Sequence, residues 1–386
     1  MKFAPVLFLL FTFSALSAGE PRKAVALANT QTPGGSLDTS LANEVKASVN
    51  RGVDWLLAQQ SPNGAWSDTN YPALTAFAVQ AVTLSGRDNA GDAISRAVAY
   101  IKSCVQPDGG IYVNVKGVKG GGLANYNTAI CITALNALKD QSLTRVIQGG
   151  RRFIAGSQHF GDDEYRGGFG YDRDTKRAYT DLLNTYYAAV AMRETAHVED
   201  LRGPGEKRMD IDWTETVKFV ERMQNKESAG TNDAGGFFYN PSDPKAGAVT
   251  NKDGVVVFRS YGSMTYAGLL ALVYANVSRD DVRVRSAFDW ASRHWSLDEN
   301  PGAGKEGLFF FYNVLTKSLA AYGQDGIPAA DGKTVAWRTE VARKLVSMQQ
   351  IDPKSGQGFW KNDTGRYWEA NPVLVTCYSL IALERL

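Results

Sequence analysis

The strongest constraint on the fold is a pattern that recurs six times along the chain. A threonine is followed six residues later by an alanine and then by an apolar residue, as in Thr75, Ala81 and Val82. The first residue of each copy is termed the anchor here; the fifth copy has tyrosine as anchor and serine in place of alanine. The six anchors are Thr75, Thr128, Thr185, Thr265, Tyr312 and Thr376. Such self-similarity is typical of a fold built from repeated copies of one supersecondary unit.

Each anchor follows a short glycine–aromatic motif, which we interpret as a loop. The motifs are GAW (64–66), GGIY (109–112), GGFGY (167–171), GGFFY (235–239), GLFFF (307–311) and GQGFW (356–360). A second segment precedes each motif and usually ends in glutamine. In these segments, residues 50–60, 94–106, 146–158, 213–224, 284–295 and 341–350, apolar residues recur at three- and four-residue spacing with charges between them. That spacing predicts helices with one buried and one solvated side.

The anchor segments differ from these amphipathic segments because they are apolar or small nearly all round. A helix of that kind is buried on every side, whereas an amphipathic helix covers the outside of a core. Six pairs of such helices predict an all-α fold, a single α6/α6 toroid with six inner and six outer helices.

Two of the loops add a glutamine at a fixed distance. Gln60, Gly64 and Trp66 form a Q-x-x-x-G-x-W pattern, and the same spacing recurs at 106–112 with tyrosine as the aromatic residue. With the six-fold register, these residues resemble the QW-repeat family of α/α toroids, which includes squalene and hopene cyclases and protein prenyltransferase β subunits. The resemblance covers residues 41–386 and implies a toroid of the terpenoid cyclase and prenyltransferase type.

The chemistry of that family is not carried over with the fold. A cyclase of this kind protonates its substrate with the aspartate two residues before the threonine of a D-x-D-D-T motif. The residues two before the anchors are Ala73, Tyr126, Leu183, Ser263, Phe310 and Leu374, and none of them can protonate an alkene. The zinc-dependent prenyltransferases need converging Asp, Cys and His ligands, and the three histidines lie outside the inner-helix register. We therefore expect no metal and no cofactor.

The N-terminus predicts export. Residues 1–18 combine an early lysine, an apolar run and small residues at its end, as a secretory signal peptide does. Residues 19–40 are rich in Gly, Ser, Thr and Pro and are expected to form a flexible leader. The expected location is secreted or periplasmic.

Composition limits the partners. A formal net charge of +2 argues against a nucleic-acid partner, which requires a concentrated basic face. Cys104, Cys131 and Cys377 are too few and too scattered for a disulfide framework; one pair could bridge, but buried free thiols are the simpler interpretation. We expect a monomer.

Residues near the start of each inner helix should face a central cavity. The candidate ligand-binding residues are Tyr71, Tyr126, Asn184, Tyr261, Tyr312 and Trp368. Aromatic faces with polar edges suit a small molecule, a lipid head group or a glycan. The alternative is that these tyrosines only fill the neck of a barrel.

The acidic third loop supplies the candidate catalytic residues Asp172, Asp174 and Asp181. Asp172 and Asp174 could bind a hard cation through oxygen ligands, although a solvated, salt-bridged loop has the same composition. Three hypotheses follow. The first is a toroid that lacks the known cyclase and zinc residues and binds a ligand in its cavity or acts by an unassigned mechanism. The second is a glycan-acting enzyme that uses these acids. The third is an interaction scaffold that uses the outer rim.

Overall fold

The computed structural model describes residues 37–115, 122–172, 180–329 and 332–386. These residues form twelve α-helices, which confirms the all-α toroid. The helices are α1 (Thr39–Ala58), α2 (Pro72–Leu84), α3 (Gly91–Ser103), α4 (Ala124–Ala137), α5 (Thr144–Ala155), α6 (Leu182–Glu194), α7 (Trp213–Arg222), α8 (Gly262–Tyr274), α9 (Val282–Arg293), α10 (Leu308–Tyr322), α11 (Trp337–Met348) and α12 (Pro372–Leu383). The predicted signal peptide and most of the predicted leader lie outside the described residues.

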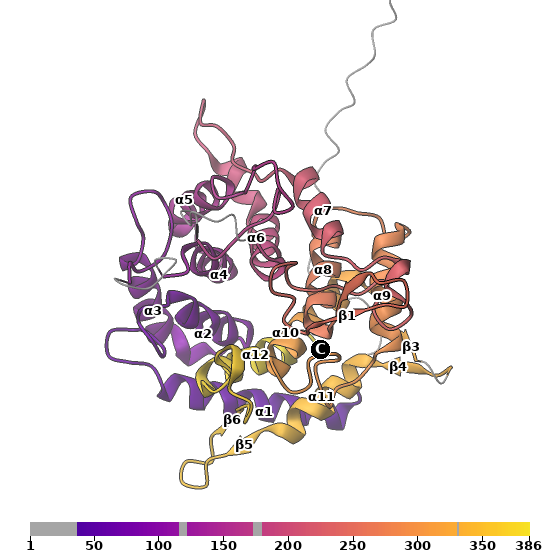
Figure 1. Cartoon of the computed structure of the whole chain (residues 1–386). Coiled ribbons are helices and arrows are strands. Elements are labelled where there is room, and N and C mark those ends of the chain that lie inside the picture. The colour runs from indigo at the N-terminus through magenta and orange to yellow at the C-terminus, as the bar shows by residue number, and fades with distance from the viewer. Residues whose placement is uncertain (1–36, 116–121, 173–179, 330–331) are drawn as a thin grey trace, which may run out of the picture. The chain divides into compact units, whose positions relative to one another are not determined.

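The even-numbered helices form the inner ring (Figure 1). Each packs against the next, α2 against α4 and so on to α12, and α12 packs back against α2, so that the ring closes. These helices are buried on nearly every side, as their apolar sequences predict; in α2 every residue from Pro72 to Val82 is buried.

The odd-numbered helices form the outer layer, as the amphipathic segments predict. Helix α5 contacts α4 through a buried side that includes Ile147, Phe153 and Ile154, while Arg152 on the same helix is exposed. Helix α1 packs against both α11 and α12, so the first and last copies of the unit are also joined in the outer layer.

The anchor threonines tie each loop to its inner helix. The Trp66 backbone N–H donates to Thr75 Oγ1 at 3.0 Å, and Trp360 donates to Thr376 Oγ1 at the same distance. Copies two, three and four repeat this bond, from Ile111 to Thr128, from Phe169 to Thr185 and from Phe237 to Thr265, at 2.8–3.1 Å. The threonine is therefore repeated because a buried loop N–H needs an acceptor at that position.

Two of the glutamines that follow the outer helices make equivalent hydrogen bonds. Gln60 Nε2 donates to the Gly64 carbonyl at 3.0 Å and to the Ala93 carbonyl of α3 at 2.8 Å. Gln158 Nε2 makes the equivalent pair of bonds, at 3.0 Å each, to Gly167 and to Asp212, which caps α7. One amide thus links its own loop to the start of the next outer helix, which fixes the angle between successive units.

The fifth copy departs from the prediction. Its GLFFF motif is not a loop, because Gly307 caps α10 in the left-handed region at φ 62° and the four residues after it form the first turn. The anchor Tyr312 is fully buried, and its hydroxyl donates to the Leu297 carbonyl at 2.5 Å. The tyrosine therefore bonds the loop with its side chain, where the other copies use a threonine oxygen.

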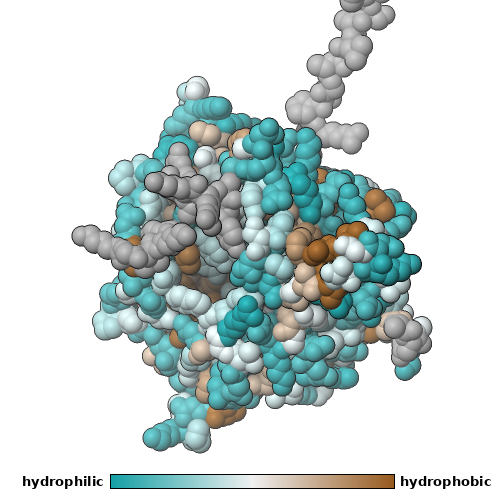
Figure 2. All heavy atoms as spheres, in the orientation of Figure 1, coloured by the Kyte–Doolittle hydropathy of each residue, from teal (hydrophilic) through white to brown (hydrophobic). Residues whose placement is uncertain are grey.

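The described residues also form three two-stranded hairpins. They pair β1 (Ala248–Thr250) with β2 (Val256–Phe258), β3 (Gly326–Pro328) with β4 (Thr334–Ala336), and β5 (Gln350–Ile351) with β6 (Gly358–Phe359), all antiparallel. Figure 2 shows a largely hydrophilic face with a hydrophobic patch over the first hairpin, where Val255 and Val256 are more than half exposed.

Two further properties bear on the sequence analysis. Within the described ranges, no helix is both long and apolar enough to cross a membrane. The three cysteines are free and buried, which confirms the simpler interpretation of their scattered positions.

Candidate functional site

A cavity of about 510 Å³ lies inside the inner ring, at the end where the inner helices begin. This volume falls within the range of about 300–1,000 Å³ that is usual for small-molecule pockets. Eight tyrosines contribute to its wall, together with Trp368 and Phe310. Among the described residues the lining consists of Tyr71, Ala73, Leu74, Leu123, Tyr126, Tyr171, Leu183, Tyr187, Tyr239, Lys245, Tyr261, Ser263, Met264, Asn300, Gly307, Phe310, Arg366, Tyr367, Trp368, Leu374 and Tyr378.

The anchor register determines which residues face this cavity. All six residues that stand two before an anchor line it, namely Ala73, Tyr126, Leu183, Ser263, Phe310 and Leu374. Six residues that occupy the same place in the repeated sequence therefore also face the same cavity. None of these six residues carries a carboxyl group.

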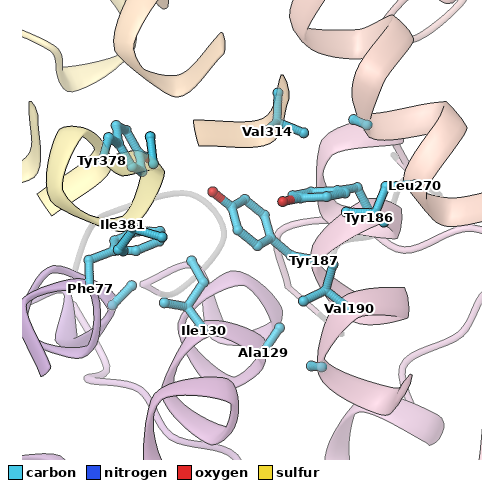
Figure 3. Packing of buried hydrophobic residues seen from close by; sticks show 14 of the residues in the cluster. Phe77, Ala129, Ile130, Tyr186, Tyr187, Val190, Leu270, Val314, Tyr378 and Ile381 are labelled. Atoms are coloured by element: carbon cyan, nitrogen blue, oxygen red, sulfur yellow. The ribbon is translucent and has the colours of Figure 1, made fainter. Parts of the chain in front are cut away.

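Aromatic side chains close the inner end of the cavity. Tyr187 of α6 lies edge-on to Tyr126, with ring centroids 5.2 Å apart, and Phe310 bridges towards Tyr378 at 5.9 Å. In Figure 3, Tyr186 and Tyr187 extend side by side from α6 into the barrel, opposite Tyr378 and Phe77. Burial raises the pKa of Tyr126 to about 12, against the effect of hydrogen bonds from Tyr378 and Tyr187. The cavity floor is thus aromatic, with neutral hydroxyl groups.

Aliphatic side chains supply another part of the cavity wall. Leu74, Leu183, Met264 and Leu374 come from the first turns of four different inner helices. Aliphatic groups offer no hydrogen bond, so this part of the cavity suits the apolar portion of a ligand.

Charged and polar groups gather at the mouth. Arg366 is paired with Glu306 at 2.6 Å, and Lys245 is paired with Asp243. Each of these cations also lies near a tyrosine ring of the lining: the Arg366 guanidinium is 4.9 Å from the centroid of Tyr367, and the Lys245 ammonium is 5.1 Å from that of Tyr239. The mouth therefore presents both signs of charge in pairs.

The mouth also contains two consecutive aromatic residues in an unusual backbone conformation. Tyr367 and Trp368 have φ values of 58° and 68°, in the left-handed region that costs an ordinary residue about 1–2 kcal/mol. Their side chains are 42 % and 46 % exposed, and Trp368 lies edge-on to Tyr71 with centroids 4.7 Å apart.

Glu369 holds this pair in place. It is fully buried, and its carboxylate accepts the Phe310 backbone N–H at 2.7 Å and the Asn362 side-chain amide at 2.6 Å. Two residues further along the chain, Asn371 Nδ2 donates to Ser67 Oγ at 2.6 Å. The segment is thus fastened both to α10 and to the loop of the first copy.

Asp181 stands behind the cavity wall rather than in it. It is fully buried and caps α6, accepting the Asn184 backbone N–H at 2.8 Å and the Asn184 side-chain amide at 2.7 Å. The Tyr239 hydroxyl, which lines the cavity, is also hydrogen-bonded to it. Burial raises the pKa of Asp181 to about 6, while the bonds from Asn184 and Tyr239 oppose that rise.

The candidate residues from the sequence are only partly brought together. Tyr71, Tyr126, Tyr261 and Trp368 line the cavity. Asn184 does not line the cavity, because its side-chain amide donates to Asp181 behind the wall. Tyr312 does not line it either, because its hydroxyl donates to the Leu297 carbonyl. Asp172 is half-buried, and Asp174 lies outside the described residues. Whether any of them binds a ligand or takes part in catalysis stays a prediction.

Sequence reasoning missed several lining residues for two reasons. Tyr187 and Tyr378 stand two residues after their anchors, so the register of the positions two before the anchors reaches them one helical turn further along. Lys245 and Tyr367 come from loops whose path the sequence does not define.

The described part of the lining contains no aspartate or glutamate. Within the same part of the chain, no cluster of three or more His, Cys, Asp or Glu side chains could hold a metal ion.

The comparisons with known proteins concern the fold. No protein-family model and no curated protein matches the sequence. Among solved structures, the chain is similar to an inactive variant of an α-1,6-mannanase from Salegentibacter sp. in complex with α-1,6-mannotriose, with a TM-score of 0.56 and 10 % identity over 90 % of this chain and 98 % of the other.

Two further solved structures have the same architecture. The type II terpene cyclase MstE from Scytonema, without ligand, gives a TM-score of 0.54 at 13 % identity, covering 89 % of this chain and 98 % of the cyclase. A family 76 glycoside hydrolase from Bacteroides thetaiotaomicron gives 0.53 at 11 % identity, covering 90 % of this chain and 77 % of the other. At such identities the likeness establishes the toroid fold and leaves the activity open.

Proposed function

We propose that this chain binds an amphipathic small molecule in its central cavity, with the apolar part inside and the polar part at the mouth. The observation that carries the proposal is the make-up of the lining. Aromatic and aliphatic side chains supply most of the wall, whereas both charged side chains of the described lining, Lys245 and Arg366, come from segments outside the inner helices and are partly exposed. The six equivalent positions without an acid support binding without the cyclase reaction.

The proposal is tested with alkyl maltosides as probes, titrated below their micelle concentrations by calorimetry. Each methylene buried in the cavity contributes about 0.8 kcal/mol, so dodecyl maltoside should bind roughly 15-fold more tightly than decyl maltoside. Affinities that do not change with chain length would contradict an apolar interior site.

A filled cavity supplies the matched variant. Leu183 lines the cavity from the first turn of α6 and is only half-buried, so there is space beside its side chain. Leu183→Trp should abolish binding of dodecyl maltoside, while Leu183→Met, which conserves volume, should leave it within about threefold. Circular dichroism and a melting curve check that both variants are folded.

A glycan-directed enzyme is the second candidate, and Asp181 is the observation that favours it. Its carboxyl group is hydrogen-bonded to cavity-lining Tyr239, and its raised pKa suits proton transfer near neutral pH. Two of the similar solved structures are described as glycan-acting proteins. Under this proposal Asp181→Asn would abolish release of reducing ends from α-linked mannan, and no release by the wild type would exclude it.

We propose export as well, on the basis of residues 1–18. Intact-mass measurement of the protein from the medium or periplasm should give a chain that lacks this segment. A full-length mass in the cytosol would contradict the proposal.

A further inference from the structure

We propose that Tyr367 and Trp368 form an outer subsite of the cavity that takes the ring of a neutral, polyhydroxylated head group, such as a sugar. The inference rests on the proposed function, because it concerns the part of an amphipathic ligand that protrudes from the cavity. It identifies the class of head group, which the shape of the cavity alone does not.

The first support is the exposure of two large aromatic side chains that also line the cavity. Trp368 is 46 % exposed and Tyr367 is 42 % exposed, although most tryptophans of this chain are buried or half-buried. Both side chains therefore border the cavity and solvent at once. A ring that leaves the cavity must pass over their faces, and the apolar face of a sugar packs on aromatic surfaces of this kind.

The second support is that the pair is held against its backbone preference. Two consecutive non-glycine residues in the left-handed region are maintained because Glu369 and Asn371, which follow the pair in the chain, fasten the segment to α10 and to the loop of the first copy. Unfavourable backbone conformations of this type persist where their side chains have a function.

The third support concerns charge. The cations at the mouth, Arg366 and Lys245, are each paired with a carboxylate. These two ion pairs offer hydrogen-bond donors and acceptors near Tyr367 and Trp368, and they add no net positive charge. That setting favours a neutral head group with hydroxyl edges over a phosphate or carboxylate, which would have to displace Glu306 or Asp243.

The experiment compares two C12 probes that share a chain and differ in the head group. Dodecyl maltoside carries sugar rings, whereas dodecylphosphocholine carries a charged head group without a ring. In Trp368→Ala the affinity for dodecyl maltoside should fall about tenfold, with less than a twofold change for dodecylphosphocholine. Trp368→Phe, which keeps an aromatic face, should recover most of the loss. Phe160→Ala, at a half-exposed aromatic residue that is not in the lining, serves as the matched control and should change neither affinity.

The outcomes separate the two proposals. If both probes bind and Trp368→Ala weakens both equally or neither, the outer subsite is refuted while cavity binding stands. If dodecylphosphocholine binds more tightly than dodecyl maltoside to the wild type, the head-group class is wrong. If neither probe binds the wild type, the proposed function fails, and the subsite with it.

Discussion

Replacing an anchor threonine by valine tests why the pattern is repeated. Thr75 is 1 % exposed, and its hydroxyl oxygen accepts the backbone N–H of fully buried Trp66 at 3.0 Å. Thr75→Val keeps the shape but leaves that N–H without a partner, which costs about 1–3 kcal/mol. Thr75→Ser keeps the acceptor and loses one buried methyl group, which costs about 0.8 kcal/mol. Valine should therefore be the more destabilising replacement.

The measurement is urea unfolding followed by both circular dichroism and tryptophan fluorescence, so that coincidence of the two curves checks two-state behaviour. Thr265 occupies the equivalent position in α8, across the ring from α2. Since the two sites share no partner, Thr75→Val and Thr265→Val should add to about 2–6 kcal/mol in the double variant. A valine variant as stable as the wild type, with serine the worse replacement, would refute the assignment of the anchor as an acceptor.

Three further predictions concern buried charge and the loops. Burial raises the pKa of Asp181 to about 6, above its value in the unfolded chain, so the contribution of this group to stability is greatest below about pH 4 and falls by about 3 kcal/mol as the pH rises through 6. Between pH 4 and 8 the free energy of unfolding of Asp181→Asn should lack this contribution to the slope. Lys317 is 2.7 Å from Glu194 and 8 % exposed, so denaturant titration of Lys317→Met should show a loss of about 3 kcal/mol, and adding Glu194→Gln should restore part of it. A Cβ on Gly64, at φ 89°, would stand 2.3 Å from a backbone carbonyl oxygen, whereas a Cβ on Gly86, at φ 63°, would meet open space. Gly64→Ala should therefore lower the melting temperature far more than Gly86→Ala, which should reduce the free energy of unfolding by about 1 kcal/mol.

The ring could be predicted from the sequence because its determinants are local and repeated. The anchor, the glycine–aromatic loop and the glutamine each make bonds within one unit or to the next unit, so each copy carries the same residues. The fifth copy shows the limit of that reasoning. There Tyr312 reaches the neighbouring loop with a long side chain, and the apolar GLFFF motif continues as helix once Gly307 has supplied the cap.

The site was less predictable because several of its residues come from loops, which do not share the repeated spacing of the inner helices. All six residues two before the anchors line the cavity because helix periodicity gives them one register, yet only Tyr126 among them is a ligand-binding candidate of the sequence analysis. Asp181, a candidate from the acidic third loop, bonds its own helix start at Asn184 instead of reaching the cavity. The outer pair at 367 and 368 depends on Glu369, whose partners lie about 60 residues earlier in the chain.

Closure of the inner ring has a consequence for how the chain folds. Helices α2 to α10 can each dock on their predecessor as they are synthesised, but the contact of α12 with α2 spans almost the whole described sequence. Until α12 (residues 372–383) is in place, the inner ring is open and the apolar sides of α2 and α10 that α12 will cover remain exposed. An incomplete ring of this type is prone to bind α12 of another chain. We therefore expect the amount of domain-swapped dimer to depend on how fast α12 docks on its own chain.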